Sequence, residues 1–264
     1  MLVMGVDIGS TASKAVIMED GIKVIAKSVV PVGTGTRGPR AVLEEVLKQA
    51  GVGLEQIRRT VATGYGRMTF EEADRQVSEV SCHGRGVHFL VPDARTVVDI
   101  GGQDAKAILL DENGMLSNFM MNDKCAAGTG RFLEVMARVL DIRVEDMGTL
   151  AEQANHAVSI SSTCAVFAES EVISRLAGNE RPENILAGIH RSVAKKVVSQ
   201  VLRIGVVPTV AMSGGVAKNQ GVVKALSQEL GQPVVVPEDC QLAGAIGAAL
   251  FAWSDLDPAS SAHH

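Results

Sequence analysis

The sequence is poor in aromatic residues and in cysteine. Its 264 residues include 1 Trp, 1 Tyr and 6 Phe, and only 4 Cys. So few rings exclude an extended aromatic platform for stacking bases, and a formal net charge of −5 gives no support for nucleic-acid binding. The cysteines stand far apart, at positions 82, 125, 164 and 240, which excludes the dense disulfide framework of a small secreted domain.

Long apolar runs are also missing. No stretch approaches the roughly 20 apolar residues that span a bilayer. A strand-like run, Leu2–Val6, begins at once, without the basic region and apolar segment of a signal peptide. We therefore expect a cytoplasmic protein that does not bind membranes, and we interpret His263 and His264 as the remains of a purification tag.

The sequence does contain an internal repeat. The phrase Val-Asp-Ile-Gly occurs at Val6–Gly9 and again at Val98–Gly101. Each copy ends an apolar strand-like run, and each is followed by a second short apolar run and a turn rich in Asp, Glu and Gly. This pattern of strand, glycine turn, strand and hairpin, used twice, predicts an internally duplicated α/β fold with two similar lobes.

The remaining periodicity predicts several helices and two further strands. Helices are expected at 39–50, 130–140, 165–177, 183–203 and 242–252, and strands at 57–62 and 206–212. We expect an N-terminal lobe at residues 1–92, a C-terminal lobe that carries the candidate cluster cysteines at residues 93–253, and a disordered tail at residues 254–264.

Three glycine turns have the composition of phosphate-binding loops. In Asp7–Lys14, glycine permits a tight turn whose backbone N–H groups face an anion, while hydroxyls and the Lys14 amine add donors. Asp99–Asp104 repeats this pattern, and Ser213–Asn219 offers a third close backbone approach. One such turn alone is as well explained by a plain hairpin, but three together favour a nucleotide site.

Paired acids accompany the first two turns. Asp7 and Asp99 suit a Mg²⁺ ion that keeps part of its water shell, because Mg²⁺ prefers oxygen ligands. Gln103 is placed to orient an attacking water, since phosphoryl transfer depends mainly on positioning and charge stabilisation. These residues favour hydrolysis over transfer to a bulky acceptor.

Two cysteines, Cys125 and Cys164, each come shortly before a predicted helix. The positive end of a helix stabilises a thiolate, and an iron–sulfur cluster normally needs four thiolates. Two cysteines from each of two chains complete such a set on a twofold axis, which requires a C2 homodimer. From the residues alone, buried structural cysteines remain the favoured alternative.

The other candidate ligands are expected to be packing or surface residues. They are Cys82, His83, His88, His156, His190 and Cys240. Glu169 and Glu171, near Cys164, are expected on the solvated face of a helix, although an interface role stays open.

With these motifs in view, the sequence resembles the ATP-dependent activators of 2-hydroxyacyl-CoA dehydratases (component A, archerase type). They belong to the BadF/BadG/BcrA/BcrD ATPase family, within the acetate kinase/heat-shock protein/actin superfamily. The resemblance covers essentially residues 1–253. The matching stretches are Asp7–Lys14, Gly33–Thr36, Thr63–Arg67, Asp99–Lys106, Asn122–Phe132, Ser161–Ser174, Ala187–His190 and Gly214–Asn219.

The resemblance implies a duplicated actin-like (ribonuclease H-like) two-lobe fold with ATP in the cleft between the lobes. It also implies a homodimer with one [4Fe–4S] cluster shared between the subunits, because Cys125 and Cys164 match the family's ligand positions. The nucleotide contacts that it implies are Ser10, Thr11, Ala12, Ser13, Lys14, Gly101, Gly102, Asp104, Gly214, Gly215, Asn219 and Gln241.

The activity that the resemblance implies is ATP hydrolysis coupled to one-electron transfer in an anaerobic setting. A ferredoxin or flavodoxin supplies the electron, and the partner is an iron–sulfur dehydratase, a benzoyl-CoA-type reductase or a double-cubane protein. A small-metabolite kinase of the same superfamily is the main alternative. A third is an actin-like or nucleotide-sensing scaffold without enzymatic activity.

Overall fold

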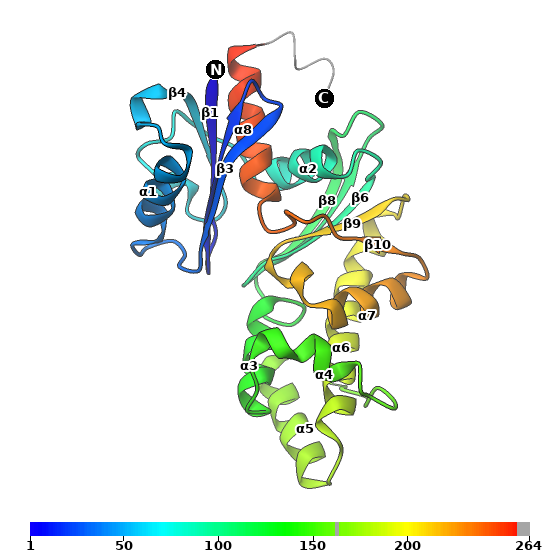
Figure 1. Ribbon diagram of the computed structural model, residues 1–264. Coiled ribbons are helices and arrows are strands. Elements are labelled where there is room, and N and C mark those ends of the chain that lie inside the picture. Colours follow the sequence, from blue (N-terminus) through cyan, green and yellow to red (C-terminus); the bar gives the residue numbers. More distant parts are fainter. Residues whose placement is uncertain (162–163, 258–264) are drawn as a thin grey trace. The chain divides into compact units, whose positions relative to one another are not determined.

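The structure, a computed structural model, describes residues 1–161 and 164–257. The chain divides into two compact units (Figure 1). The first comprises Met1–Arg95, Leu109–Asn118 and the segment from Pro237 onward, and the second comprises Thr96–Ile108 and Phe119–Val236. No helix in the described ranges combines the length and apolar character needed to cross a bilayer.

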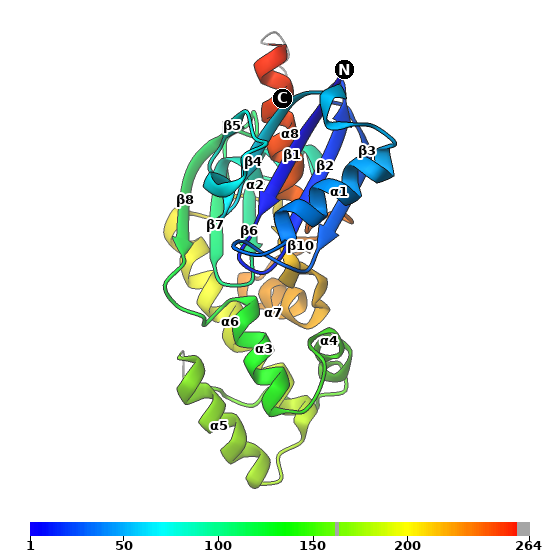
Figure 2. The same cartoon turned by 90° about the vertical axis from the view of Figure 1, so that its left-hand side faces the viewer.

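The first sheet has the strand order β3-β2-β1-β4-β5. Its strands are β1 (Leu2–Ile8), β2 (Ser13–Glu19), β3 (Lys23–Val30), β4 (Ile57–Thr63) and β5 (Arg75–Gln76). β2 pairs antiparallel with both β1 and β3. β4 runs parallel to β1, and β5 runs parallel to β4. The sheet is therefore an antiparallel meander extended by parallel strands, as Figure 2 shows.

Both faces of this sheet are covered, because its strands bury residues of both parities. Met4 and Val6 of β1 belong to an apolar cluster with α1 (Gly38–Ala50), whereas Val3 belongs to a second cluster with α8 (Ala243–Leu256). Successive strand residues point to opposite faces, so a continuous apolar run requires a layer on each side. α2 (Glu79–Leu90) packs against α8.

Glycine brings α8 into backbone contact with its neighbours. A Cβ atom on Gly5 of β1 would lie 2.0 Å from the carbonyl oxygen of Ala245. A Cβ atom on Gly247 of α8 would lie 1.8 Å from the carbonyl oxygen of Cys82 in α2. Only a residue without a side chain fits such contacts, so these glycines determine how closely α8 approaches β1 and α2.

The second sheet has the order β10-β9-β6-β7-β8. Its strands are β6 (Thr96–Ile100), β7 (Ala105–Leu110), β8 (Leu116–Asn122), β9 (Val210–Ser213) and β10 (Val234–Val235). β9 runs parallel to β6, and β10 runs parallel to β9. The order of β6, β7 and β8 and the parallel partner of β6 repeat the arrangement of the first sheet.

Helices make up most of the second unit. They are α3 (Gly130–Val139), α4 (Met147–Ala151), α5 (Ala165–Ala177), α6 (Pro182–Ile204) and α7 (Gln220–Leu230). α6 packs against α7, α4 contacts both, and α3 packs against α5. Short 3₁₀ helices lie at Leu54–Gln56 (η1), Arg67–Thr69 (η2), Val144–Asp146 (η3) and Gly215–Lys218 (η4).

The predicted duplication is confirmed, because each Val-Asp-Ile-Gly phrase ends a strand and opens a turn into the next one. Two predicted boundaries were wrong. The strand expected at 206–212 is only Val210–Ser213, and the last helix continues to Leu256, into the expected tail. Ser162, Thr163 and the positions from 258 onward lie outside the described residues.

Candidate nucleotide and cluster sites

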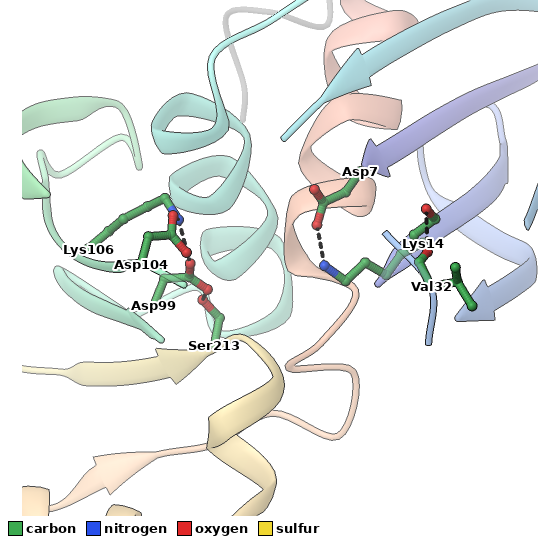
Figure 3. A network of polar contacts seen from close by, with 8 residues as sticks. Asp7, Lys14, Val32, Asp99, Asp104, Lys106 and Ser213 are labelled. Carbon is green, nitrogen blue, oxygen red and sulfur yellow. Dashed lines mark hydrogen bonds and ion pairs between the residues drawn. The ribbon is translucent and has the colours of Figure 1, made fainter. Parts of the chain in front are cut away.

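The first phosphate-loop candidate joins β1 to β2. Asp7 and Lys14 are directly opposite each other in the antiparallel register, and Lys14 Nζ lies 3.0 Å from Asp7 Oδ2. Asp7 is 3% exposed. The turn between them closes with a hydrogen bond of 3.0 Å from the Gly9 amide to the Ala12 carbonyl. The hairpin therefore holds a buried carboxylate and a partly exposed amine beside a glycine turn (Figure 3).

A second segment braces this turn. The amide of Thr34 donates to the Gly9 carbonyl over 3.0 Å, and the Ser13 hydroxyl donates to the Val32 carbonyl over 2.9 Å. Ser10 is half-buried and Thr11 is exposed, whereas Ala12 is buried. In this structure Ser13 therefore supports the loop, and Thr11 is the most exposed of its three hydroxyl residues.

The second phosphate-loop candidate contains a more deeply buried charge cluster. Lys106 Nζ lies 3.1 Å from Asp99 Oδ2 and also pairs with Asp104. The Ser213 hydroxyl donates to Asp99 Oδ1 over 2.8 Å. Figure 3 shows Lys106 beside Asp99 and Asp104, with Ser213 next to Asp99. Both oxygens of Asp99 are thus held, which gives the carboxylate one orientation.

The turn between Asp99 and Asp104 is closed by its own backbone. The Gly101 amide donates to the Asp104 carbonyl over 2.9 Å, and a Cβ atom on Gly101 would lie 2.3 Å from Asp104 Oδ1. Gly102 is half-buried, and Gln103 is exposed. A side chain at position 101 would thus displace the Asp104 carboxylate, and the turn leaves the Gln103 side chain accessible.

This turn is also bonded to the helix that follows Cys125. The Gly130 amide donates to the Gly101 carbonyl over 2.9 Å, and the Arg131 amide donates to the Gly102 carbonyl over 2.8 Å. Gly130 and Arg131 are the first two residues of α3. A displacement of the Gly101–Gly102 turn must therefore act on the start of α3 through two short backbone contacts.

The third glycine turn follows β9. Gly214 has φ +88°, and a Cβ atom there would lie 2.3 Å from the Ile100 carbonyl oxygen, so glycine is required. Gly215 opens η4, and Asn219 caps α7 by accepting from the Val222 amide over 3.2 Å. Asn219 Nδ2 is buried without a hydrogen-bond partner among the described residues. Gln241 is half-buried and belongs to the first unit.

The four cysteines fall into two classes. Cys82 and Cys240 are buried in the first unit, and burial raises the pKa of the Cys82 thiol to about 12. Cys125 is half-buried and Cys164 is exposed, and both belong to the second unit. The two predicted cluster ligands are therefore the two cysteines that a cofactor can reach.

Their local settings differ from each other. Cys164 is the N-cap of α5, as predicted. Cys125 instead lies in a turn five residues before the start of α3, where the Asn122 side-chain amide donates to its carbonyl over 3.0 Å. The helix-dipole argument therefore applies directly to Cys164 but not to Cys125, because the dipole acts only within the first turn.

An apolar surface accompanies Cys164. Val166 and Phe167 of α5 are 68% and 69% exposed, and Ile173 is 51% exposed.

No group of three or more His, Cys, Asp or Glu side chains suited to a metal ion occurs within the described part of this single chain.

Two residues of the Asp99 cluster were not singled out from the sequence as site residues. Lys106 lies seven positions after Asp99, as Lys14 lies seven positions after Asp7. Ser213 is opposite Asp99 in the parallel register, where Thr63 is opposite Asp7. The offset of seven was a usable signal for Lys106, whereas the role of Ser213 depends on strand pairing.

Two related proteins are similar to this chain over nearly its whole length. The chain is 54% identical over 255 residues to the 2-hydroxyisocaproyl-CoA dehydratase activator of Clostridioides difficile. This match covers 97% of this chain and 96% of that protein. It is 52% identical over 251 residues to the (R)-2-hydroxyglutaryl-CoA dehydratase activating ATPase of Acidaminococcus fermentans, with 95% and 96% covered.

Solved structures agree with the sequence relatives. The activator of the 2-hydroxyisocaproyl-CoA dehydratase from Clostridium difficile, solved with bound ADPNP, matches this structure with a TM-score of 0.95 at 53% identity. The match covers 99% of this chain and 98% of that one. The predicted actin-like fold class is thereby confirmed. Residues 4–252 match the family model, and the chain therefore belongs to the BadF/BadG/BcrA/BcrD ATPase family.

Proposed function

We propose that this protein is an ATP-hydrolysing activator that delivers an electron to a partner iron–sulfur enzyme, a 2-hydroxyacyl-CoA dehydratase or a related reductase. Relatives that are 52% and 54% identical are named as dehydratase activators, and one of them as an activating ATPase. Within this chain, the observation that carries the proposal is the pair of hydrogen bonds between the Gly101–Gly102 turn and the start of α3.

The nucleotide is assigned to the glycine turns. The proposed contacts to ATP or ADP are Ser10, Thr11, Ala12, Ser13, Lys14, Gly101, Gly102, Asp104, Gly214, Gly215, Asn219 and Gln241. The residues present suit such a ligand, because the buried Asn219 Nδ2 lacks a partner within the described chain. Buried polar atoms are normally hydrogen-bonded, so a donor in this state is matched by an acceptor that the chain itself does not supply.

Hydrolysis is assigned to the two aspartates and Gln103. Asp7 and Asp99 suit Mg²⁺ held through water molecules, and the exposed Gln103 suits an attacking water. Asp99 already accepts from Lys106 and Ser213. An ionised carboxylate has about four acceptor positions, so Asp99 retains capacity for metal-bound water.

The cysteines suit an iron–sulfur cluster shared between two chains. Cys125 and Cys164 are accessible while Cys82 and Cys240 are buried, so one chain offers two of the four thiolates that a cluster needs. A C2 homodimer supplies all four, and the exposed apolar residues of α5 suit burial in such an interface. When bound, the [4Fe–4S] cluster would supply one-electron storage, filled by a ferredoxin or flavodoxin.

Coupling in this proposal depends on how the nucleotide acts on the chain. ATP and ADP can favour different arrangements only if their affinities for those arrangements differ. A γ-phosphate at the Gly101–Gly102 turn changes the contacts of that turn, and the hydrogen bonds to Gly130 and Arg131 carry the change to α3. Cys125 precedes α3, so its position changes with the nucleotide. An anaerobic cytoplasm is the setting that keeps such thiols and iron reduced.

The test is a titration of the anaerobically reconstituted protein with ATP and with ADP. Iron per dimer, the absorbance spectrum, binding to a dehydratase and electron delivery are measured together. We expect one cluster per dimer, and we expect partner binding and electron delivery to differ between ATP and ADP. Identical behaviour with both nucleotides would rule out the coupling. Phosphorylation of a small metabolite by iron-free protein would instead support the kinase alternative.

A further inference from the structure

Helix α2 brings a buried histidine to the first phosphate loop. His83 is 5% exposed and follows Cys82, whose side chain is hydrogen-bonded to that of Thr63. Thr63 ends β4 and is opposite Asp7 of β1 in the parallel register. The contact of Cys82 therefore places this part of α2 near the ends of β1 and β4, where the loop begins. All of these residues belong to the first unit.

Gly244, the second residue of α8, lies where His83 and Asp7 meet. A Cβ atom on Gly244 would be 2.8 Å from His83 Nε2 and 3.0 Å from Asp7 Oδ2. One point is thus within hydrogen-bonding distance of both atoms, so the imidazole and the carboxylate converge on the same side of α8. Figure 3 shows Asp7 next to this helix. A methyl group at position 244 would displace at least one of the two groups.

The packing of α2 against α8 fixes this approach. A Cβ atom on Gly86 of α2 would lie 1.8 Å from the carbonyl oxygen of Ala243, the first residue of α8. Together with the contact between Gly247 and Cys82, this brings the two helix backbones together at positions on either side of His83. His83 is therefore carried by a pair of packed helices, and such elements hold functional groups more precisely than loops do.

The two repeats hold their aspartates in different ways. In the second repeat, the Ser213 hydroxyl donates to Asp99 Oδ1 over 2.8 Å. Thr63 occupies the matching register position in the first repeat, but its hydroxyl donates to the Val77 carbonyl over 2.9 Å. A hydroxyl has one hydrogen to donate, so that of Thr63 is not available to Asp7. The first repeat therefore needs another donor for the role that Ser213 has in the second.

Lys14 does not fill this role by itself. It pairs with Asp7 Oδ2 over 3.0 Å, but it is also one of the proposed contacts to ATP, and its side chain is 15% exposed. An ammonium that is drawn towards phosphate oxygens holds the carboxylate less firmly. His83 is buried, and an imidazole carries at least one N–H donor whether or not it is protonated. Its ring is therefore suited to hold Asp7 while Lys14 engages the nucleotide.

We propose that His83 is a positioning residue for ATP hydrolysis, and that its ring holds the Asp7 carboxylate as Ser213 holds that of Asp99. The inference rests on the function proposed above, in which Asp7 accepts from the water shell of Mg²⁺. A carboxylate that is already oriented meets this shell without reorganising, which stabilises the transition state more than it strengthens nucleotide binding. Loss of His83 should therefore lower kcat and leave the KM for ATP unchanged.

The test compares variants of the full-length protein after anaerobic reconstitution. His83→Leu keeps most of the side-chain volume but removes the N–H donor. It should lower kcat by about tenfold or more, the usual effect of losing a hydrogen bond to a charged group. The KM for ATP at saturating Mg²⁺ should stay the same. His83→Gln retains an N–H donor and should recover part of the loss in kcat.

Binding of Mn²⁺ in the presence of ADP, followed by electron paramagnetic resonance, gives a readout that needs no turnover. His83→Leu should weaken this binding severalfold in the otherwise unaltered protein. In the Asp7→Asn protein, His83→Leu should cause no further weakening, because two residues that act through one contact do not contribute additively. Equal weakening in both backgrounds would show that His83 does not act through Asp7.

Val87→Ala is the matched control, because Val87 lies one turn further along α2 and is fully buried. It should lower the free energy of unfolding, measured with urea, while kcat and Mn²⁺ affinity stay unaltered. The assignment fails if Val87→Ala reduces kcat as much as His83→Leu does. It also fails if His83→Leu leaves both kcat and Mn²⁺ binding unaltered.

Gly244→Ala provides a second variant, which keeps both groups and does not depend on the folding of His83→Leu. Its methyl group would lie within 3.0 Å of His83 Nε2 and Asp7 Oδ2, so it should separate them and lower kcat in the same way. An unaltered kcat in Gly244→Ala would contradict the proposal. If the unaltered protein neither hydrolysed ATP nor bound Mn²⁺ with ADP, the proposed function would fail instead.

Discussion

Lys106 and Asp99 form an ion pair of 3.1 Å in which both side chains are only 2% exposed. Lys106 also pairs with Asp104, so one buried ammonium serves the carboxylates on both sides of the Gly101–Gly102 turn. The corresponding lysine of the first repeat, Lys14, pairs with one carboxylate, that of Asp7, in the described part of the chain and is 15% exposed. The lysine of the second hairpin is therefore more deeply buried, and makes more ion pairs, than the lysine of the first hairpin.

Replacing Lys106 by methionine should destabilise the protein strongly. The substitution leaves a buried carboxylate without its counter-ion, which typically costs about 3–5 kcal/mol in the free energy of unfolding. Urea denaturation measures the loss. Lys14→Met is the control from the first repeat and should cost less, because the Lys14–Asp7 pair is more exposed. Equal losses for the two variants would contradict the expectation that the ion pairs of Lys106 stabilise the fold more than the Lys14–Asp7 pair does.

Cys164→Ser should prevent stable iron binding, and Cys125→Ser should do the same. Each change removes one thiolate per chain and therefore two from a shared set of four. Iron analysis and absorbance after anaerobic reconstitution measure the effect, and nucleotide binding should persist. Cys240→Ala is the control, because Cys240 is buried in the first unit. A Cys164→Ser protein with a full cluster would refute the ligand assignment.

Gly247→Ala should destabilise the first unit. The new methyl carbon would lie 1.8 Å from the Cys82 carbonyl oxygen, so α8 and α2 must separate. Overpacking of this kind costs about 1–3 kcal/mol, and each kcal/mol lowers the melting temperature by about 2–4 °C in a protein of this size.

The control for Gly247 is Gly178→Ala, at the end of α5. Its φ is −81°, and the nearest atom to a new Cβ, the Arg175 carbonyl oxygen, would be 3.4 Å away. Thermal unfolding of this variant should match that of the unaltered protein. If both alanine variants melted alike, the glycine contact between α2 and α8 would not limit stability.

Stability should fall on mild acidification because of His190. Its pKa is lowered from 6.5 to about 4 by burial, so between these values the unfolded chain binds a proton that the folded chain does not. The free energy of unfolding is therefore unaffected by His190 above pH 6.5 and decreases as the pH falls towards 4. The total contribution is on the order of 3 kcal/mol.

Denaturation at several pH values tests this dependence. His190→Gln should flatten the slope between pH 6.5 and 4, because glutamine does not titrate. An unaltered slope in His190→Gln would assign the acid sensitivity to other groups.

Local sequence signals predicted much of the fold. Both Val-Asp-Ile-Gly hairpins were predicted because strand, glycine turn and strand are adjacent in the chain. The predicted start of β9, at residue 206, was wrong for a local reason. Pro208 lacks an N–H donor, and the strand begins after it, at Val210. The extension of α8 beyond its predicted end depends on residues that are distant in the sequence. Ser254 accepts a hydrogen bond from Arg85, and Asp255 pairs with Arg59 and Arg75.

The candidate site was predictable only in part, for similar reasons. Glycine turns and their acids are contiguous motifs, so Asp7, Asp99 and Gly214 were visible in the sequence. His83 was assigned to packing or to the surface, since no second pair of ligands accompanies Cys82 and His83 in the sequence. Its approach to Asp7 arises from the packing of α2 against α8, and no local pattern encodes such a contact.

The contact between β1 and α8 affects how the protein must be synthesised. One face of β1, with Val3, is covered by Ala245 and Ala249 of α8, which is synthesised long after β1. Chains emerge from the ribosome at about 5–20 residues per second, N-terminal end first. That face of the first sheet must therefore wait, uncovered, for more than 200 further residues. Until α8 is made, this uncovered apolar face is a place where the nascent chain can aggregate.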